Sequence, residues 1–198
     1  MKAWRLNGAA IALCLCAGLS AAHAGWQDDA SPYDVKRFSL LEESKSRGLS
    51  EAQSGPDAAL VHAVVDAAAV SASEGALMGN WRCRTIKLGG MTADVVYSWF
   101  RCRVSERDGA LEFEKVSGSQ KLNGRLYANE SGGYVLLGAL SAKGEPAHRY
   151  SGNNQAAGAQ ATPDDVIGLL EATGRSTARI EFPYPVQESV FDVIELQR

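Results

Sequence analysis

The chain has 198 residues, of which 45% are hydrophobic by type and 22% are charged, and its formal net charge is −3. A chain of this length forms one ordinary domain. Its mildly acidic balance argues against general nucleic-acid binding, because such binding draws most of its affinity from a basic surface.

Residues 1–24 have the features of a secretory signal peptide. A basic start and a short apolar core at 9–19 precede the small-x-small pattern Ala22-His23-Ala24. The core is too short for a spanning helix, which needs about 20 apolar residues. Both cysteines in it follow leucines, which disfavours a lipid anchor. We therefore expect cleavage after Ala24 and a periplasmic or secreted protein with no transmembrane segment. It would keep 18 basic and 23 acidic residues, for a net charge of −5.

The next part, residues 25–78, is predicted to be a helical segment that packs on the rest of the protein. Ser31 followed by proline is a good N-cap, and apolar residues then recur at helical spacing until Gly48. A second helix is predicted after Asp57, where the apolar residues form one stripe. The small residues of 71–79 mark the boundary before the strands.

Residues 79–198 are predicted to form a β-barrel domain, because apolar residues there recur with a period of two between turn signals. Asp108-Gly109 favours a tight hairpin that sets Arg103 opposite Glu114. The expected strands are 81–88, 95–105, 111–116, 125–129, 134–140, 177–182 and 190–196, with a polar loop at 141–164.

The segment 163–173 is ambiguous between helix and strand. Its start resembles a helix N-terminus. Gly168, however, lowers its helix propensity, and Gly174 can turn the chain back to form a hairpin with the next strand. A strand is favoured because it gives about eight successive antiparallel strands, which can close into a barrel without exposed edges. The expected fold class is therefore mainly β, an antiparallel barrel preceded by two N-terminal helices.

The two cysteines that remain after cleavage, Cys83 and Cys102, are predicted to form a disulfide. An exported protein can keep such a bond. Two cysteines cannot complete a four-ligand zinc site, and these lack the CxxC redox spacing. Closing a loop of this length contributes about 3 kcal/mol on the chain-entropy model. Free thiols and pairing between molecules are the alternatives.

Each cysteine stands in an aromatic-Arg-Cys-Arg phrase, WRCR or FRCR. If the cysteines are directly opposite, Arg82 faces Arg103. Arg84 likewise faces Arg101, and facing like charges destabilise a sheet unless something relieves them. One interpretation is an outward lattice of arginines and acids, with Glu114 beside Arg103. The other is a site for a carboxylate, a phosphate or an acidic partner, which the guanidinium fork suits.

The same phrases carry a resemblance to a known family. GNWRCRTIKLGG, WFRCRV and the ending PYPVQESVFDVIEL resemble an uncharacterised bacterial family of exported proteins, the domain of unknown function 4893, through most of the chain after the signal peptide. Since that family has no assigned activity, the resemblance implies no catalytic residue. Gly79-x-Trp81 is similar to the opening of lipocalin-type barrels, which implies a lipocalin- or calycin-like barrel and no particular function.

Motifs for catalysis or metal binding are missing from the sequence. It has no GxSxG elbow, HExxH pair, Walker A loop or GxGxxG turn, and its aspartate pairs lack the alternating oxygen ligands of a calcium loop. His62 and His148 lie in different regions. His62 and Asp66 are four apart on a predicted helix, and a solvated helix face is favoured there over a metal or catalytic pair. No cofactor, metal or catalytic residue is assigned.

The favoured function is a non-enzymatic binding module for a small acidic or amphiphilic ligand, and an interior cavity would support it. One alternative is a module that binds an envelope protein or inhibits a protease through the terminal segment 25–30, which a solid barrel with an exposed apolar patch would support. The other is an enzyme with carboxylates from distant parts of the sequence. The anion-binding residues of the favoured function would be Arg82, Arg84, Arg101 and Arg103.

Overall fold

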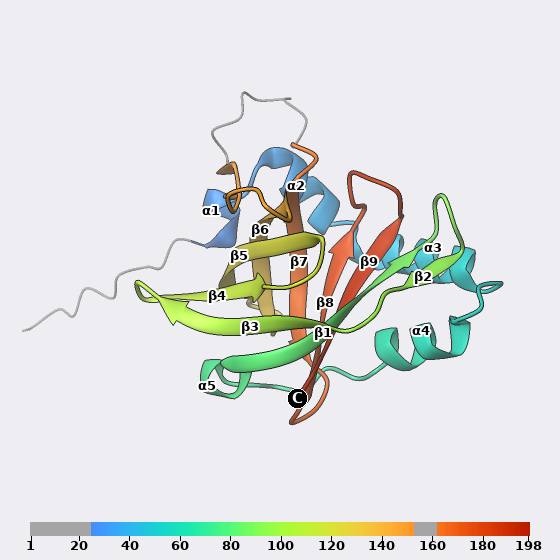
Figure 1. The fold of residues 1–198 in the computed structure, drawn as a ribbon, viewed down its shortest axis with the longest axis horizontal. Coiled ribbons are helices and arrows are strands. Elements are labelled where there is room, and N and C mark those ends of the chain that lie inside the picture. The colour runs from blue at the N-terminus through green and yellow to red at the C-terminus, as the bar shows by residue number, and fades with distance from the viewer. Residues whose placement is uncertain (1–24, 153–161) are drawn as a thin grey trace, which may run out of the picture.

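The computed structural model describes residues 25–152 and 162–198, so the predicted signal peptide and part of the predicted loop at 141–164 lie outside the described residues. The described residues form nine antiparallel strands in one sheet, with short helices around it (Figure 1). Eight of these strands close into a barrel, because the first strand also pairs with the last. The expected fold class, a mainly β antiparallel barrel, is confirmed.

The strands follow one another around the barrel in chain order, apart from β2, which pairs only with the far half of β1. The predicted strand at 163–173 is β7, which resolves the ambiguity between helix and strand. The strands are β1 (Gly79–Leu88), β2 (Asp94–Val96), β3 (Phe100–Arg107), β4 (Ala110–Lys115), β5 (Gln120–Ala128), β6 (Tyr134–Ala142), β7 (Asp165–Ala172), β8 (Thr177–Pro183) and β9 (Phe191–Gln197).

One predicted strand, 95–105, is interrupted. Residues 97–99 separate β2 from β3, and the Trp99 ring lies against the guanidinium groups of Arg82 and Arg84, 4.4 and 4.6 Å from its centroid. A cation over an aromatic face is attractive, which gives Trp99 a place outside the regular ladder. The strand prediction was therefore correct in position and wrong in continuity.

The turn between β3 and β4 forms as predicted. Asp108 and Gly109 have φ angles of 53° and 74°, the left-handed values that a two-residue type I′ turn needs at both positions. This turn sets the register, in which Arg103 pairs with Glu114 and Val104 with Phe113.

Apolar side chains fill the barrel interior and close one of its ends. The short helix α5 (Glu74–Leu77) lies at that end, where Leu77 is 2% exposed and its carbonyl accepts a hydrogen bond of 2.8 Å from the Trp81 indole. The Arg198 guanidinium covers the same indole ring at 4.0 Å. The other end holds polar side chains, among them Lys87 and Lys115.

The helices before the barrel depart from the sequence prediction. The helix expected from Ser31 to Gly48 is two helices, separated at Ser39 and Leu40, and the second continues past Gly48. Gly48 does not end the helix, because it is the site of closest packing on the barrel. A Cβ there would lie 2.7 Å from the Phe191 Cβ and 3.3 Å from that of Leu88. The helices are α1 (Trp26–Asp29), α2 (Pro32–Phe38), α3 (Leu41–Ala52) and α4 (Ala58–Val65), the last beginning after Asp57 as predicted.

These helices cover two outer faces of the barrel (Figure 1). Helices α3 and α4 bury the outer side chains of β1 and β9, such as Ile86 and Phe191, and α1 and α2 bury those of β6 and β7. Trp26 of α1 packs edge-on against Phe38, so the terminal segment 25–30 is docked on the barrel. Over the described residues, no helix has the length and apolar character needed to cross a membrane.

Candidate functional site

The predicted disulfide is present between Cys83 and Cys102 and joins β1 to β3. The register differs from the expected one, since Cys83 lies opposite Phe100 and Cys102 lies opposite Trp81. The cysteines are therefore diagonal neighbours, with their Cα atoms 5.8 Å apart. A shift of two residues keeps each side chain on its own face of the sheet, so both sulfurs still point into the barrel.

This register corrects the expected pairing of the arginines. Arg82 faces Arg101 across the strands, and Arg103 faces Asn80. The expected pairs, Arg82 with Arg103 and Arg84 with Arg101, are wrong because they assumed directly opposed cysteines. Trp81 and Cys83 are buried inside the barrel, so the alternating arginines project outward. We call this surface the arginine face, defined by Arg82, Arg84, Arg101 and Arg103.

Most charges of the arginine face have partners. Arg84 donates to Glu195 at 2.5 Å, and Arg103 donates from Nε to Glu114 at 3.1 Å. Arg82 donates to the side-chain oxygen of Gln197 and shares the Trp99 ring with Arg84. Within the described part of the chain, only the exposed Arg101 lacks a side-chain partner. This arrangement is the outward lattice of arginines and acids, and its assignment as an anion site stays a prediction.

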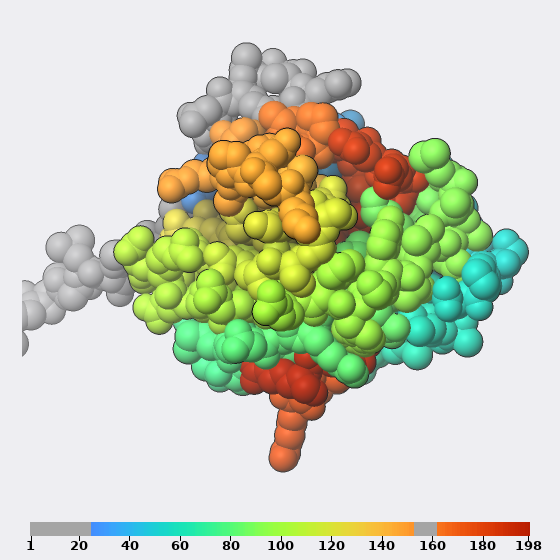
Figure 2. All heavy atoms as spheres, in the orientation of Figure 1, coloured from blue at the N-terminus to red at the C-terminus, as the bar shows by residue number. Residues whose placement is uncertain are grey.

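A second basic region lies nearby, in a groove on the outer face of β4, β5 and β6. It has a volume of about 930 Å³ and is bounded by the loop 147–152, within the range of 300 to 1,000 Å³ typical of ligand sites. Figure 2 shows the orange residues of this loop above the yellow residues of β5, with the surface hollowed between them. We call this site the outer groove.

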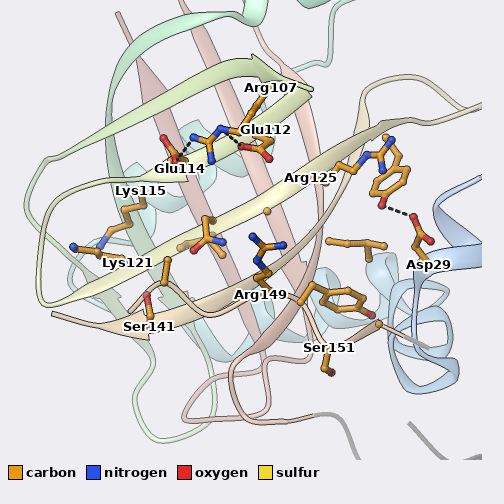
Figure 3. A pocket seen from close by; sticks show the side chains of 18 of the residues that line it. Asp29, Arg107, Glu112, Glu114, Lys115, Lys121, Arg125, Ser141, Arg149 and Ser151 are labelled. Carbon is orange, nitrogen blue, oxygen red and sulfur yellow. Dashed lines mark hydrogen bonds and ion pairs between the residues drawn. The ribbon is translucent and has the colours of Figure 1, made fainter. Parts of the chain in front are cut away.

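Strand alternation places the charges of the outer groove. Lys121, Asn123 and Arg125 are every second residue of β5 and share its outer face, as Glu112 and Glu114 do on β4. Across the two strands, Arg125 is paired with Glu112 and Asn123 with Glu114. Arg149 reaches in from the loop on the opposite side, and Figure 3 shows its guanidinium in the middle of the groove.

The acids of β4 and the bases of β5 and the loop differ in whether they are neutralised. Arg107 lies 3.4 Å from both Glu112 and Glu114, and the latter also accepts from Arg103. Lys121, Arg125 and Arg149 have no acid partner among the residues that the structure describes, and Arg125 only covers the Tyr127 ring at 4.8 Å. The acids Asp29 and Asp108 also line the groove without a cation partner among these residues, so its five basic and four acidic residues give it a net charge of +1.

A buried hydroxyl adds to this imbalance. Ser141 on β6 is 3% exposed, lines the groove and lies opposite Lys121 across the strands. Its hydroxyl has no hydrogen-bond partner among the residues that the structure describes, although buried polar groups nearly always have one. A ligand oxygen in the groove would supply the missing partner.

The wall that carries Arg149 is held in place by buried polar contacts. The Tyr150 hydroxyl donates to Asp34, which forms an ion pair of 2.7 Å with Arg37, and the Ser151 amide donates to Asp165 at 3.1 Å. Burial and the bond to Asp34 raise the pKa of the Tyr150 hydroxyl far above its usual value, so it stays protonated. The two residues that follow the loop arginine are thus held in place without a ligand.

The sequence prediction missed the outer groove. The i, i+2, i+4 spacing of Lys121, Asn123 and Arg125 is a signal that could have found part of it. The predicted strand began at Arg125, however, and so left Lys121 in a turn. Arg149 belongs to a loop and had no periodic signal at all.

The interior of the barrel offers much less space. The cavity at its open end has a volume of about 80 Å³, roughly half of the 150 Å³ that accommodates benzene in a designed cavity. This cavity has no room for the chain of a fatty acid. On α4, the exposed side chains of His62 and Asp66 are joined by a hydrogen bond of 2.9 Å, in keeping with a solvated helix face.

Comparisons with known proteins place the chain in a family without naming an activity. No curated protein and no solved structure matches it. A family model does match, over residues 26–196, which includes the helices, the whole barrel and both aromatic-Arg-Cys-Arg phrases. The chain therefore belongs to the family described as a domain of unknown function, DUF4893.

Proposed function

We propose that this protein is an exported, non-enzymatic binding module that holds a polar anionic ligand in the outer groove. One observation carries the proposal: Lys121, Arg125 and Arg149 have no acid partner among the described residues, and they line the same groove as the buried hydroxyl without a hydrogen-bond partner there. Export rests on the sequence features of residues 1–24 and agrees with the disulfide, which suits an oxidising compartment.

The charges of the groove define the ligand class. Guanidinium and ammonium groups bind carboxylates and phosphates by charge-assisted hydrogen bonds. The acids on β4 are already held by Arg103 and Arg107, so they compete little for the cations on β5 and the loop. Because most residues that line the groove are charged or polar, we propose a hydrophilic anion such as a phosphate ester or an acidic sugar.

The groove also suits binding because it is assembled in advance. Arg149 directly precedes Tyr150 and Ser151, whose contacts hold this part of the loop, and Arg125 and Lys121 project from a regular strand. Rigid placement lowers the entropy lost when a ligand is held. On the arginine face, in contrast, three of the four guanidinium groups are already bound to side chains of the protein itself.

The test measures thermal melting with inorganic phosphate and with glucuronate as probes. A ligand at ten times its dissociation constant stabilises a protein by about 1.4 kcal/mol, which raises the melting temperature of a domain of this size by roughly 3–6 °C. The double variant Arg125→Gln with Arg149→Gln should lose this increase. Arg101→Gln is the matched control, because Arg101 is also exposed and without an acid partner.

The control separates the two basic regions. If Arg101→Gln removes the response to phosphate and the groove variant keeps it, the arginine face is the anion site and the groove proposal is wrong. If neither probe raises the wild-type melting temperature, even at about 50 mM, the groove does not bind simple anions.

A further inference from the structure

The open end of the barrel is a separate cavity with its own chemistry. Inward side chains from seven of the eight barrel strands line it, and its volume is about 80 Å³. We call it the mouth cavity. Its wall is apolar on the sides of β5 to β9, where it is formed by Leu122, Leu140, Val166, Phe182 and Ile194.

Lys115 brings a positive charge to this cavity. Its side chain is 7% exposed, and its Nζ donates to the carbonyls of Ser117 at 3.3 Å and Gln120 at 2.5 Å. It also stands 4.2 Å from the centroid of the Phe100 ring. The two carbonyls accept from two of the three N–H groups of the ammonium, and all of these neighbours are neutral.

The positive charge of Lys115 therefore has no negative partner, although its ammonium donates two hydrogen bonds. No carboxylate forms an ion pair with it in the parts of the chain that the structure describes. A buried charge without a counter-ion is costly, and burial accordingly lowers the pKa of this ammonium. An anion in the cavity would supply the missing negative charge and stabilise the ammonium.

The second lysine of the mouth cavity is in a different state. Lys87 projects from β1, and its Nζ lies 2.6 Å from the Glu188 carboxylate. It is also the cross-strand partner of Asp192. Lys87 is thus already neutralised, which leaves Lys115 as the cation that faces the apolar wall without a counter-charge.

We propose that the mouth cavity binds a short-chain carboxylate, with its oxygens at the Lys115 ammonium and its aliphatic part against Leu122, Leu140 and Val166. The volume limits the aliphatic part to a few carbon atoms. The mouth cavity and the outer groove share Lys115 and Leu122 as lining residues, but the apolar wall belongs mostly to the cavity. The proposal does not rest on the function proposed for the groove, which is carried by the cations of β5 and the loop 147–152.

Binding at this site should depend on pH through Asp192. Burial raises the pKa of the Asp192 carboxyl to about 6, against the opposing effects of the Ser189 hydroxyl and Lys87. Protonation below this pH removes a negative charge from the cavity, while a free carboxylate of ordinary pKa stays largely ionised above pH 5. Binding should therefore tighten as the pH falls from 8 to 5. The other charged groups at or beside the cavity are Lys87, Glu188, Lys115, Arg37 and Asp165.

The experiment is calorimetric titration with acetate, propionate, butyrate and octanoate. Affinity should rise from acetate to propionate and not further to butyrate or octanoate. Lys115→Met should weaken propionate binding about tenfold or more. Since this change also removes the bonds that hold the β4–β5 turn, Val166→Phe provides a second test, because it fills the cavity and keeps the lysine. Val166→Phe should retain the response to inorganic phosphate in the outer groove, which Val166 does not line.

The pH series adds a readout that a packing defect would not produce. In wild type, propionate affinity should rise about threefold or more between pH 8 and pH 5, and Asp192→Asn should flatten that rise. The proposal is overturned if propionate does not bind at about 50 mM, or if it binds with unchanged affinity to both Lys115→Met and Val166→Phe. Affinity that still increases from propionate to octanoate would also contradict it.

Discussion

The arginine face and the outer groove are both basic surfaces on neighbouring strands of the same barrel, but they differ in how their charges are used. On the arginine face, Glu195, Glu114, Gln197 and the Trp99 ring hold three of the four guanidinium groups. In the groove, Lys121, Arg125 and Arg149 have no acid partner among the described residues. A conspicuous charge motif can therefore be a neutralised lattice, while available charge is assembled from residues that share no motif.

The difference follows from what each region must do structurally. The arginine face covers the two strands that the disulfide joins, and its acids come from β4 and β9, the strands on either side. Facing arginines such as Arg82 and Arg101 need such relief, because like charges across a ladder repel. The groove cations stand apart from each other on β5 and on a loop, so the fold tolerates them unpaired.

The largest expected effect on stability comes from removing the Cys83–Cys102 disulfide, which lies beneath the arginine face. Replacing Cys83 and Cys102 with alanine should lower the free energy of unfolding by about 3 kcal/mol, because the unfolded chain gains the entropy of the open loop. Urea denaturation of the variant and of wild type measures this difference. Below its melting temperature, the variant should keep its phosphate response. Loss of that response in a folded variant would show that the two basic regions are coupled.

The next effect concerns the best-held charge of the arginine face. Arg84→Gln should cost about 1–2 kcal/mol, because the side chain is only 16% exposed and the change leaves the equally buried Glu195 carboxylate without its cation. Arg101→Gln, on the same face, should change stability by no more than about 0.5 kcal/mol. Equal costs for the two variants in urea denaturation would contradict the contrast between paired and unpaired arginines.

Glu114 stands between the two regions, and its removal should make them more alike. Glu114→Gln frees Arg103 and leaves Arg107 with Glu112 alone, with a stability cost of about 0–1 kcal/mol, the usual range for exposed pairs. The added positive potential should tighten phosphate binding in the groove about twofold. Glu106→Gln is the matched control, since Glu106 is an exposed acid of β3 that does not line the groove. A similar gain in the control would point to net charge alone.

The smallest effect on stability is expected in the groove itself. The double variant Arg125→Gln with Arg149→Gln should unfold within about 0.5 kcal/mol of wild type in the absence of anions, because neither side chain has an acid partner to lose. The same variant should show the greatest loss of phosphate binding. A loss of stability of several kcal/mol without ligand would mean that these arginines have a structural role.

The sequence predicted those parts of the fold that local pattern controls. Period-two alternation located the strands, and Asp108-Gly109 fixed one hairpin and its register. The register of β1 and β3 was beyond such reasoning, because a shift of two residues changes no side chain's face. Gly48 misled for a related reason. Glycine is common where a helix ends, but the role of Gly48 is set by its close packing on Phe191, which is distant in sequence.

The candidate site was harder to predict than the fold. Parity on β5 could have brought Lys121 and Arg125 together, whereas the position of Arg149 depends on buried contacts between a loop and α2. Whether a cation is free depends on which acids come near it in three dimensions, and Glu112 and Glu114 are committed to Arg107 only because of the β3–β4 turn. Sequence alone could list the charges of this protein without showing which of them are available.

The seam between β1 and β9 has a consequence for the order in which the chain folds. Arg84 and Glu195 meet there across a sequence separation of 111, whereas the disulfide spans only 19. By loop-closure entropy the seam costs about 1.5 kcal/mol more to close, and contacts of such range form late. The disulfide between β1 and β3 can therefore form early, whereas the barrel closes only when β9 pairs with β1. Damage to β9 would leave an open sheet with two unpaired edges, which is the form most prone to aggregate.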